Sequence, residues 1–440
     1  MALVQRWAGR GPAATKIKSV RLFLKLQIPI ILVVAAAYFL IIWPLHNPHP
    51  KFVFPEGTLA IRDVRLYIAP DSDPIEHATV LARTGIIVAA GKDVTIPQDT
   101  NIVECPNCTV TAGFWNSHVH FTEQKWAYSA FKSADTLNAQ LADMLTSRGF
   151  TTVVDLSSDP RQTISLRRRI ETGNLKGPLI YTAGQGIFPP HGIPYYLADL
   201  PAIDRWLMPQ PETPEAAARI EERNIRIGAD VLKLFTGSIV EPHKVLPMPL
   251  DIAAAAVEVA HSHGQLAFAH PTNLEGTTVA LDSGVDVLAH APSSPAGIDT
   301  AFLKSIVDRH RAMVPTLKMF ATTASTDPAY LQPIYAVVRQ FHALGGDFLF
   351  GTDVGYMKDY STDDEFKALA ESGLNYRDML RMLTVAPAAR FGVTALKGTV
   401  TPGKLADLVV LDGDPATDIG VFSRVHYTIR AGRLIYERSK

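Results

Sequence analysis

The stretch Gly113-Phe-Trp-Asn-Ser-His-Val-His120 decides the fold. It closes an apolar, strand-like run, and the alternation of side chains along a strand puts His118 and His120 on one face, near enough to share a metal ion. Four more polar side chains lie at or near the ends of similar runs: Lys233, His270, His290 and Asp353. In a barrel of parallel strands the carboxyl ends meet at one mouth, so all six are predicted to form one metal site.

The spacing of these six residues fits a (β/α)₈ barrel. Such a barrel has about 250 residues and uses roughly 31 for each strand and helix. Counted in these units from the histidine pair on strand 1, the other four residues fall on strands 4, 5, 6 and 8. Eight apolar runs alternate with helical patterns, at residues 110–119, 150–157, 178–184, 231–236, 266–270, 285–290, 312–317 and 347–353. We therefore expect an α/β chain with a TIM-like barrel over residues 113–394.

Both ends of the chain differ from this centre. Residues 57–112 and 395–440 alternate apolar and polar positions in short pieces, which is the period of antiparallel strands. We expect the two ends to fold together as one small β-sandwich, with residues 57–112 as its first part and residues 395–440 as its second.

The amino-terminal segment combines positive charge with hydrophobicity. Six basic residues occur up to Lys25, the first acidic residue is Glu56, and the run from Ile28 to Trp43 is uncharged. We predict a cytoplasmic basic tail at residues 1–21, a transmembrane helix at 22–43 and a Pro-rich linker at 44–56. This arrangement predicts a single-pass protein of the inner (cell) membrane with its catalytic domain on the periplasmic or extracellular side. A cleaved signal peptide is the alternative.

The charge balance argues against a nucleic-acid partner. The chain holds 42 basic and 43 acidic residues, and six of the basic residues lie in the amino-terminal segment. The rest of the chain is therefore net negative and lacks the basic surface that nucleic acid requires. With 47% hydrophobic and 19% charged residues, it can bury a large globular core.

The chain has two cysteines, Cys105 and Cys108, in the motif Cys-Pro-Asn-Cys. The motif lies in a turn between strand-like segments, whereas a redox-active pair would open a helix. In an exported chain we expect a disulfide that closes this turn. A zinc site is disfavoured because two further ligands are not apparent.

Lys233 poses a separate problem, because burying an ammonium without a partner in an apolar strand is costly. One interpretation is an ion pair with a carboxylate. The other is a carbamate formed with carbon dioxide, which turns the lysine into a carboxylate-like ligand able to bridge two cations. The four histidines and the aspartate at other strand ends favour the carbamate.

These motifs resemble the amidohydrolase superfamily, in particular its imidazolonepropionase-like and Xaa-Pro dipeptidase-like branch. The resemblance runs from about residue 57 to the carboxyl terminus. It rests on residues 113–120, Lys233, His270-Pro-Thr-Asn-Leu-Glu-Gly, Ala289-His290, Gly351-Thr-Asp353, Thr384-Val-Ala-Pro-Ala-Ala-Arg and Gly398-Thr-Val-Thr-Pro-Gly-Lys-Leu-Ala-Asp-Leu-Val-Val-Leu. One departure is Trp115-Asn116, where many relatives carry an aspartate.

The resemblance implies a binuclear site. It places His118, His120 and Asp353 on one divalent metal ion, and His270 and His290 on the other. Carbamylated Lys233 and a hydroxide would bridge the two ions, of which zinc is the expected kind, with carbon dioxide as the source of the carbamate. Asp353 is also the expected catalytic residue, which accepts the hydroxide proton and passes it to the leaving nitrogen.

We therefore predict a metal-dependent amidohydrolase that cleaves a C–N bond in a small amide, dipeptide or cyclic amide. One alternative is a mononuclear deaminase or a cyclic amide or lactone hydrolase, and another is a non-catalytic interaction module. Candidate substrate-binding residues lie in loops that follow the strands: His191, Tyr195, Tyr196, Lys318 and Tyr356. A homo-oligomer is left open.

Overall fold

The computed structural model describes residues 31–200 and 202–438 of the 440-residue chain. The chain divides into residues 1–46 and residues 47–440, and each unit is described by itself. In the first unit, residues 31–37 are α-helical and are followed by the π-helix η1 (Tyr38–Ile42) and the 3₁₀ turn η2 (Trp43–Leu45).

The predicted transmembrane helix at residues 22–43 is wrong. Within residues 31–200 and 202–438, no helix is both long enough and apolar enough to cross a membrane. The membrane partner and the single-pass inner-membrane localisation depended on this helix and are corrected with it. The predicted tail at residues 1–21, and residues 22–30 of the predicted span, lie outside the described residues.

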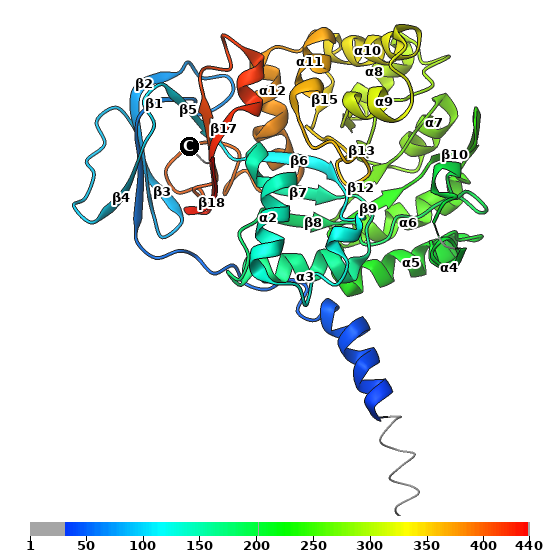
Figure 1. Ribbon diagram of the computed structural model, residues 1–440. Coiled ribbons are helices and arrows are strands. Elements are labelled where there is room, and N and C mark those ends of the chain that lie inside the picture. Colours follow the sequence, from blue (N-terminus) through cyan, green and yellow to red (C-terminus); the bar gives the residue numbers. More distant parts are fainter. Residues whose placement is uncertain (1–30, 201, 439–440) are drawn as a thin grey trace, which may run out of the picture. The chain divides into compact units, whose positions relative to one another are not determined.

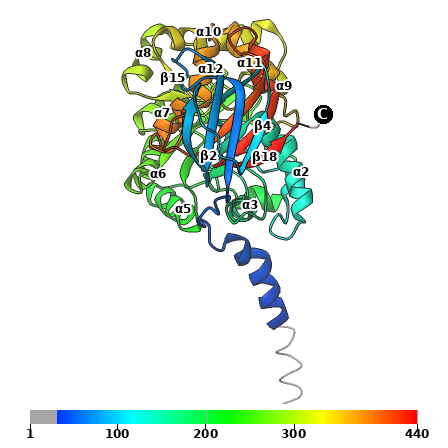
Figure 2. The same cartoon turned by 90° about the vertical axis from the view of Figure 1, so that its left-hand side faces the viewer.

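The two ends of the second unit form one eight-stranded sheet (Figure 1). Its strands are β1 (Thr58–Leu66), β2 (Ile75–Arg83), β3 (Ile86–Gly91), β4 (Thr100–Glu104), β5 (Cys108–Ala112), β16 (Leu408–Asp412), β17 (Val425–Arg430) and β18 (Arg433–Glu437). The sheet order is β18-β17-β16-β5-β1-β2-β3, and β4 pairs with β1. The ends meet where β5 and β16 run antiparallel, with Val410 opposite Val110. Figure 2 views this sheet with the helices of the barrel behind it.

Eight parallel strands form the barrel. They are β6 (Phe114–Val119), β7 (Phe150–Asp155), β8 (Leu179–Thr182), β9 (Val231–Leu234), β12 (Leu266–Ala269), β13 (Val287–Leu288), β14 (Ala312–Met313) and β15 (Asp347–Phe348). Strands β6 to β8 pair in one sheet and β9 to β15 in another. Parallel bridges from Ile187 to Leu234 and from Val119 to Val354 join the two sheets at both edges.

The helices lie outside these strands (Figure 1). They are α2 (Ala134–Met144), α3 (Pro160–Glu171), α4 (Ala202–Leu207), α5 (Pro214–Ile227), α6 (Leu250–Ser262), α7 (Leu274–Asp282), α8 (Thr300–Asp308), α9 (Leu317–Thr323), α10 (Pro328–Ala343), α11 (Asp363–Glu371), α12 (Tyr376–Leu383) and α13 (Val385–Arg390). A hairpin of β10 (Gly237–Glu241) and β11 (Lys244–Pro247) follows β9. Short polar residues start many helices by accepting a bond from the first turn, as Asp159 does for α3 and Asn273 for α7.

The first barrel strand is shorter than its sequence pattern. The apolar run 110–119 contains two strands, because residues 110–112 belong to β5 and pair with β16. Gly113 separates β5 from β6, and an added Cβ would lie 2.3 Å from the hydroxyl oxygen of Thr151. Only glycine therefore fits at residue 113, where the chain passes from the sheet to the barrel. The apolar periodicity of the sequence does not show that one strand ends and another begins there.

The disulfide between Cys105 and Cys108 is present, as predicted. Both cysteines are buried in the apolar core of the eight-stranded sheet. The backbone amide of Cys108 donates to the Cys105 carbonyl over 3.0 Å, which closes the turn.

The buried carboxyl group of Glu221 should make the stability of the protein depend on pH. It is fully buried in α5, and burial raises the pKa of its carboxyl to about 8, against the hydrogen bond from Asn224, which lowers it. The folded state therefore holds the proton more tightly than the unfolded chain, where a glutamate has a pKa of about 4.3, so the free energy of unfolding should fall as pH rises from about 4 to 8.

The Glu221→Gln variant should remove this effect. We expect it to be more stable than the unaltered protein by about 1 kcal/mol or more at pH 9, and nearly unchanged at pH 4. Urea denaturation at both pH values measures the difference. Glu222→Gln, which alters the exposed neighbour, is the control. Equal destabilisation by Glu221→Gln at both pH values would contradict the prediction.

Candidate metal centre and active site

Two histidines and one aspartate meet at the carboxyl ends of the first and last barrel strands. The Oδ1 atom of Asp353 lies 2.9 Å from Nε2 of His120 and 3.4 Å from Nε2 of His118. The two Nε2 atoms are 3.3 Å apart. His290 also belongs to this cluster, because His118, His290 and Asp353 each offer a ligand atom within 4.8 Å of the others. These residues come from β6, the end of β13 and the loop after β15, which are far apart in sequence.

Each of three histidines is oriented by its Nδ1 atom. Nδ1 of His118 donates to the Ala289 carbonyl over 2.7 Å, and Nδ1 of His120 donates to the Ser157 carbonyl over 2.8 Å. Nδ1 of His290 lies 2.7 Å from the Thr316 hydroxyl. Because carbonyl oxygens only accept, Nδ1 of the first two rings carries a proton, and a neutral ring then presents the Nε2 lone pair to the site.

His270 and His290 lie beside each other at the ends of β12 and β13. Their ring centroids are 4.4 Å apart, and the His290 ring is 4.6 Å from that of His118. Burial, followed by the charges of Lys233 and His120, lowers the pKa of His270 to about 3. Burial also lowers the pKa of His118 and His290 well below the ordinary value. Neutral imidazoles are the form that binds metal ions.

Lys233 lies among these groups on β9 with 1% of its surface exposed. Its ammonium is 5.2 Å from the centre of the Phe235 ring, and no carboxylate within the described residues makes a salt bridge to it. Burial lowers the pKa of Lys233 to about 7, although the charge of Asp353 raises it. Its amine can therefore lose its proton near neutral pH.

The loop that carries Asp353 needs an unusual backbone. Asp353 itself has φ +60°, in the left-handed region, and Gly355 has φ +97°. An added Cβ on Gly355 would lie 1.8 Å from the His120 carbonyl, so only glycine allows the loop to approach that strand. The side chain of buried Asn116 joins β6 to the same loop, because its amide donates to the Thr352 hydroxyl over 2.7 Å. The Asn116 amide therefore holds the Asp353 loop against β6.

The arrangement fits a bound cation. Two Nε2 lone pairs and a carboxylate oxygen point at one another, and such a group is repulsive unless a cation or an added proton lies between them. Oδ1 of Asp353 is buried without a hydrogen-bond partner among the described residues. In the absence of a cation, His120 must take the proton: burial is the largest single effect and lowers its pKa, but nearby Asp353 and the charge of Asp155 together raise it by more. A divalent ion would satisfy the same atoms without that proton.

Comparison with known protein families identifies the chain. Residues 109–435 match the amidohydrolase family, a stretch that includes the whole barrel and the strands that follow it. The chain belongs to the amidohydrolase family. It is accordingly a hydrolase that acts on carbon–nitrogen bonds, and the family generally uses divalent metal ions. The comparison with curated proteins found no match.

Several solved structures share the fold. A Xaa-Pro dipeptidase is 24% identical with a TM-score of 0.73, over 87% of this chain and 100% of that chain. A prolidase complexed with n-methylphosphonate-l-proline is 23% identical with a TM-score of 0.73, over 87% of this chain and 100% of that chain. A. niger ochratoxinase is 19% identical with a TM-score of 0.70, over 87% of this chain and 96% of that chain. At these identities the likeness shows the amidohydrolase fold.

Two of the predicted substrate-binding residues lie near the amidohydrolase site. The rings of Tyr196 and Tyr356 are 5.6 Å apart, and Tyr195 is 5.8 Å from Tyr196. Burial, followed by the charges of Asp353 and Tyr195, raises the pKa of Tyr356 to about 12. Burial likewise raises the pKa of Tyr196, with smaller contributions from Tyr356 and Asp353.

Two further candidates, Lys318 and His191, are placed differently. The ammonium of buried Lys318 pairs with Asp359 over 2.8 Å and donates to the Ser361 carbonyl over 2.7 Å. Those contacts tie α9 to the loop before α11, so the charge already has partners. His191 is exposed in the loop after β8, with φ +55°.

Sequence reasoning did not single out Asp155, at the end of β7. Its buried carboxylate accepts bonds from three hydroxyls, those of Ser158, Thr163 and Thr182. Ser158 also accepts from the Phe121 amide over 2.8 Å, so Asp155 anchors the turn beside His120. The signal was visible, because an acidic residue within the run 150–157 repeats the pattern of Asp353. Phe235 was also missed; its ring stacks on His270 at 5.4 Å.

Proposed function

We propose that this chain is a binuclear metal-dependent hydrolase that cleaves the C–N bond of a small amide or peptide-like substrate. The observation that carries the proposal is a group of four histidines and Asp353 around a buried lysine that lacks a salt bridge among the described residues. His118, His290 and Asp353 are buried, and His120 and His270 are partly exposed. A buried ammonium without a counter-ion is costly, and a carbamate removes that charge.

The six predicted ligands would divide between two ions. His118, His120 and Asp353 would hold one ion, and His270 and His290 the other. Lys233 would serve both, after its uncharged amine adds to carbon dioxide and releases one proton to leave a carbamate with two ligand oxygens. Zinc suits this set of imidazole and carboxylate donors.

The chemistry of hydrolysis divides between the ions and the protein. Bound divalent ions lower the pKa of water and polarise a carbonyl group. Asp353 would accept the proton that the water loses and deliver it to the nitrogen that leaves. The turn anchored by Asp155 and the loop held by Asn116 fix His120 and Asp353, so that neither ligand needs to reorganise during the reaction.

Aromatic rings supply much of the surroundings of the site. Phe235 lies against His270, Phe320 is 6.2 Å from His290, and Tyr196 packs on Tyr356 near Asp353. Such rings exclude water and accept apolar substrate groups, while the two tyrosine hydroxyls can bond a carbonyl or an amide. A dipeptide, an N-acyl amino acid or a cyclic amide fits this environment.

A mononuclear deaminase or lactone hydrolase is a second candidate. The observation that favours it is the tight group of His118, His290 and Asp353, whose ligand atoms already lie close enough for a single ion. In that enzyme Lys233 would remain an amine.

Metal content separates these functions. We expect two zinc ions per chain by elemental analysis of protein prepared with zinc and bicarbonate, and hydrolysis of members of a library of dipeptides, N-acyl amino acids and lactones. Chelation should abolish activity, and zinc should restore it. One ion per chain would favour the mononuclear enzyme. A protein that binds no metal and has no activity would favour the non-catalytic interaction module.

A further inference from the structure

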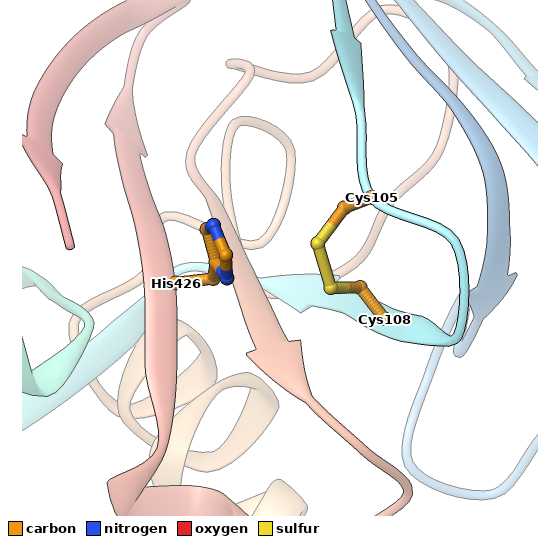
Figure 3. Close-up of side chains that lie close together, drawn as sticks. All are labelled: Cys105, Cys108 and His426. Atoms are coloured by element: carbon orange, nitrogen blue, oxygen red, sulfur yellow. A yellow bond between two sulfur atoms is a disulfide. The ribbon is translucent and has the colours of Figure 1, made fainter. Parts of the chain in front are cut away.

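A second group of potential metal ligands lies in the eight-stranded sheet, away from the barrel residues described above. Cys105, Cys108 and His426 each offer a ligand atom within 4.8 Å of the other two. Figure 3 shows the imidazole of His426 facing the two sulfur atoms from a neighbouring part of the sheet. The histidine belongs to β17 and Cys108 to β5, and β16 lies between them. This histidine supplies a third ligand that the sequence did not reveal.

The turn between the cysteines is already built for two sulfur ligands. Asn107 has φ +69°, which asparagine tolerates, and Pro106 precedes it, a position at which tight turns favour proline. The turn stays closed through the backbone bond from Cys108 to Cys105 and not only through the sulfurs. A Cys-x₂-Cys spacing is typical of zinc sites.

The surroundings also suit an ion. Both cysteines are at least nine-tenths buried among apolar residues, where metal–thiolate bonds are shielded from water, and His426 is partly exposed, which gives an entry path. Arg438 lies 3.3 Å from Nδ1 of His426, but it also bonds to Asp412 over 2.6 Å. Arg438 therefore keeps its bond to Asp412 if the His426 ring turns to bind an ion.

We propose that Cys105, Cys108 and His426 form a redox-gated site for a thiophilic divalent ion such as Zn²⁺. The site is closed while the sulfurs are bonded to each other. Reduction by a phosphine and water breaks that bond and yields two thiols and the phosphine oxide, and Zn²⁺ then displaces the two thiol protons. Two cysteines and one histidine, with water in the fourth position, are a known zinc ligand set.

The movement required is small. Zn–S bonds of about 2.3 Å in a tetrahedral site put two sulfurs roughly 3.7 Å apart, which rotation about the side-chain bonds of a four-residue turn can supply. The histidine is already within reach, so the ion needs no rearrangement of the strands.

Cobalt(II) provides the test, because thiolate-to-cobalt charge transfer gives near-ultraviolet absorption that nitrogen and oxygen ligands do not. The chain holds only these two cysteines, so cobalt in the barrel cannot produce this absorption. The full-length protein, loaded with its barrel metal, is reduced with a phosphine, freed of it without oxygen and titrated with Co²⁺. We expect one equivalent of thiolate-bound cobalt per reduced chain, its displacement by Zn²⁺, and no such band in the oxidised chain.

Variants assign the ligands. His426→Ala should weaken cobalt binding by more than about tenfold, since removing even an outer partner of a metal ligand has effects of this size. His263→Ala, at the exposed end of α6, should bind as the unaltered protein does. A reduced chain that keeps its circular dichroism but shows no charge-transfer band would overturn the proposal. Equal affinity in His426→Ala, or loss of the fold on reduction, would overturn it as well.

Discussion

The Lys233→Ala variant should lose both metal ions and more than about 100-fold of the activity. If a carbamate on Lys233 bridges the ions, its removal takes one ligand from each ion at once. Loss of a group that only hydrogen-bonds a metal ligand already lowers metal affinity or activity by about 10- to 100-fold, so the loss of a ligand should cost more. A short-chain carboxylic acid added to this variant should restore part of the activity, because the bridge requires only two oxygens in the vacated space. Elemental analysis and turnover, each measured with and without the acid, check both expectations.

A second variant controls for packing. Lys233→Met fills the space on β9 with an apolar chain, so it should fold as well as Lys233→Ala but respond to no added acid. Full metal content and full turnover in Lys233→Ala would refute the bridging carbamate. One tightly held ion and no rescue would instead favour the mononuclear enzyme.

Asp353→Asn should lower kcat by on the order of 10² to 10⁴. The asparagine amide keeps the size of the side chain but cannot accept the proton from water, and it is a weaker metal ligand. Asparagine is the least disturbing replacement, because it tolerates the φ of +60° at this position, where alanine would add backbone strain. Steady-state kinetics with the best substrate of the library measure the loss.

The matched control is Asp364→Asn. Asp364 forms an exposed ion pair with Lys367 on α11, and exposed ion pairs contribute little to the stability of a protein. Its kinetics should equal those of the unaltered protein. If Asp353→Asn kept kcat within about threefold while its metal content was unchanged, another group would have to move the proton. Asp155, whose charge acts on His120, would be an alternative carboxylate to test.

Much of the fold was predictable because its signals are local. Apolar runs alternating with helical patterns indicated the eight barrel strands, and each observed strand falls within or overlaps its predicted run. The two β-rich ends pair with each other through β5 and β16. The predicted membrane span was wrong, because no helix within residues 31–200 and 202–438 is both long enough and apolar enough to cross a membrane.

The sequence by itself determined the amidohydrolase family and the six side chains at the carboxyl ends of strands, because a motif and its spacing are properties of the chain. Their roles as ligands remain a prediction. Only the tertiary structure decided which groups orient those side chains: the Ser157 carbonyl on His120, Thr316 on His290 and Asn116 on the Asp353 loop.

Only the tertiary structure likewise showed that His426 lies beside the Cys105–Cys108 turn. Contacts of this kind join residues that are up to hundreds of positions apart, and they depend on the order and register of strands in a sheet. A shift of one residue in a strand turns every side chain to the opposite face, so local pattern cannot specify them and only the closed barrel and the completed sheet do.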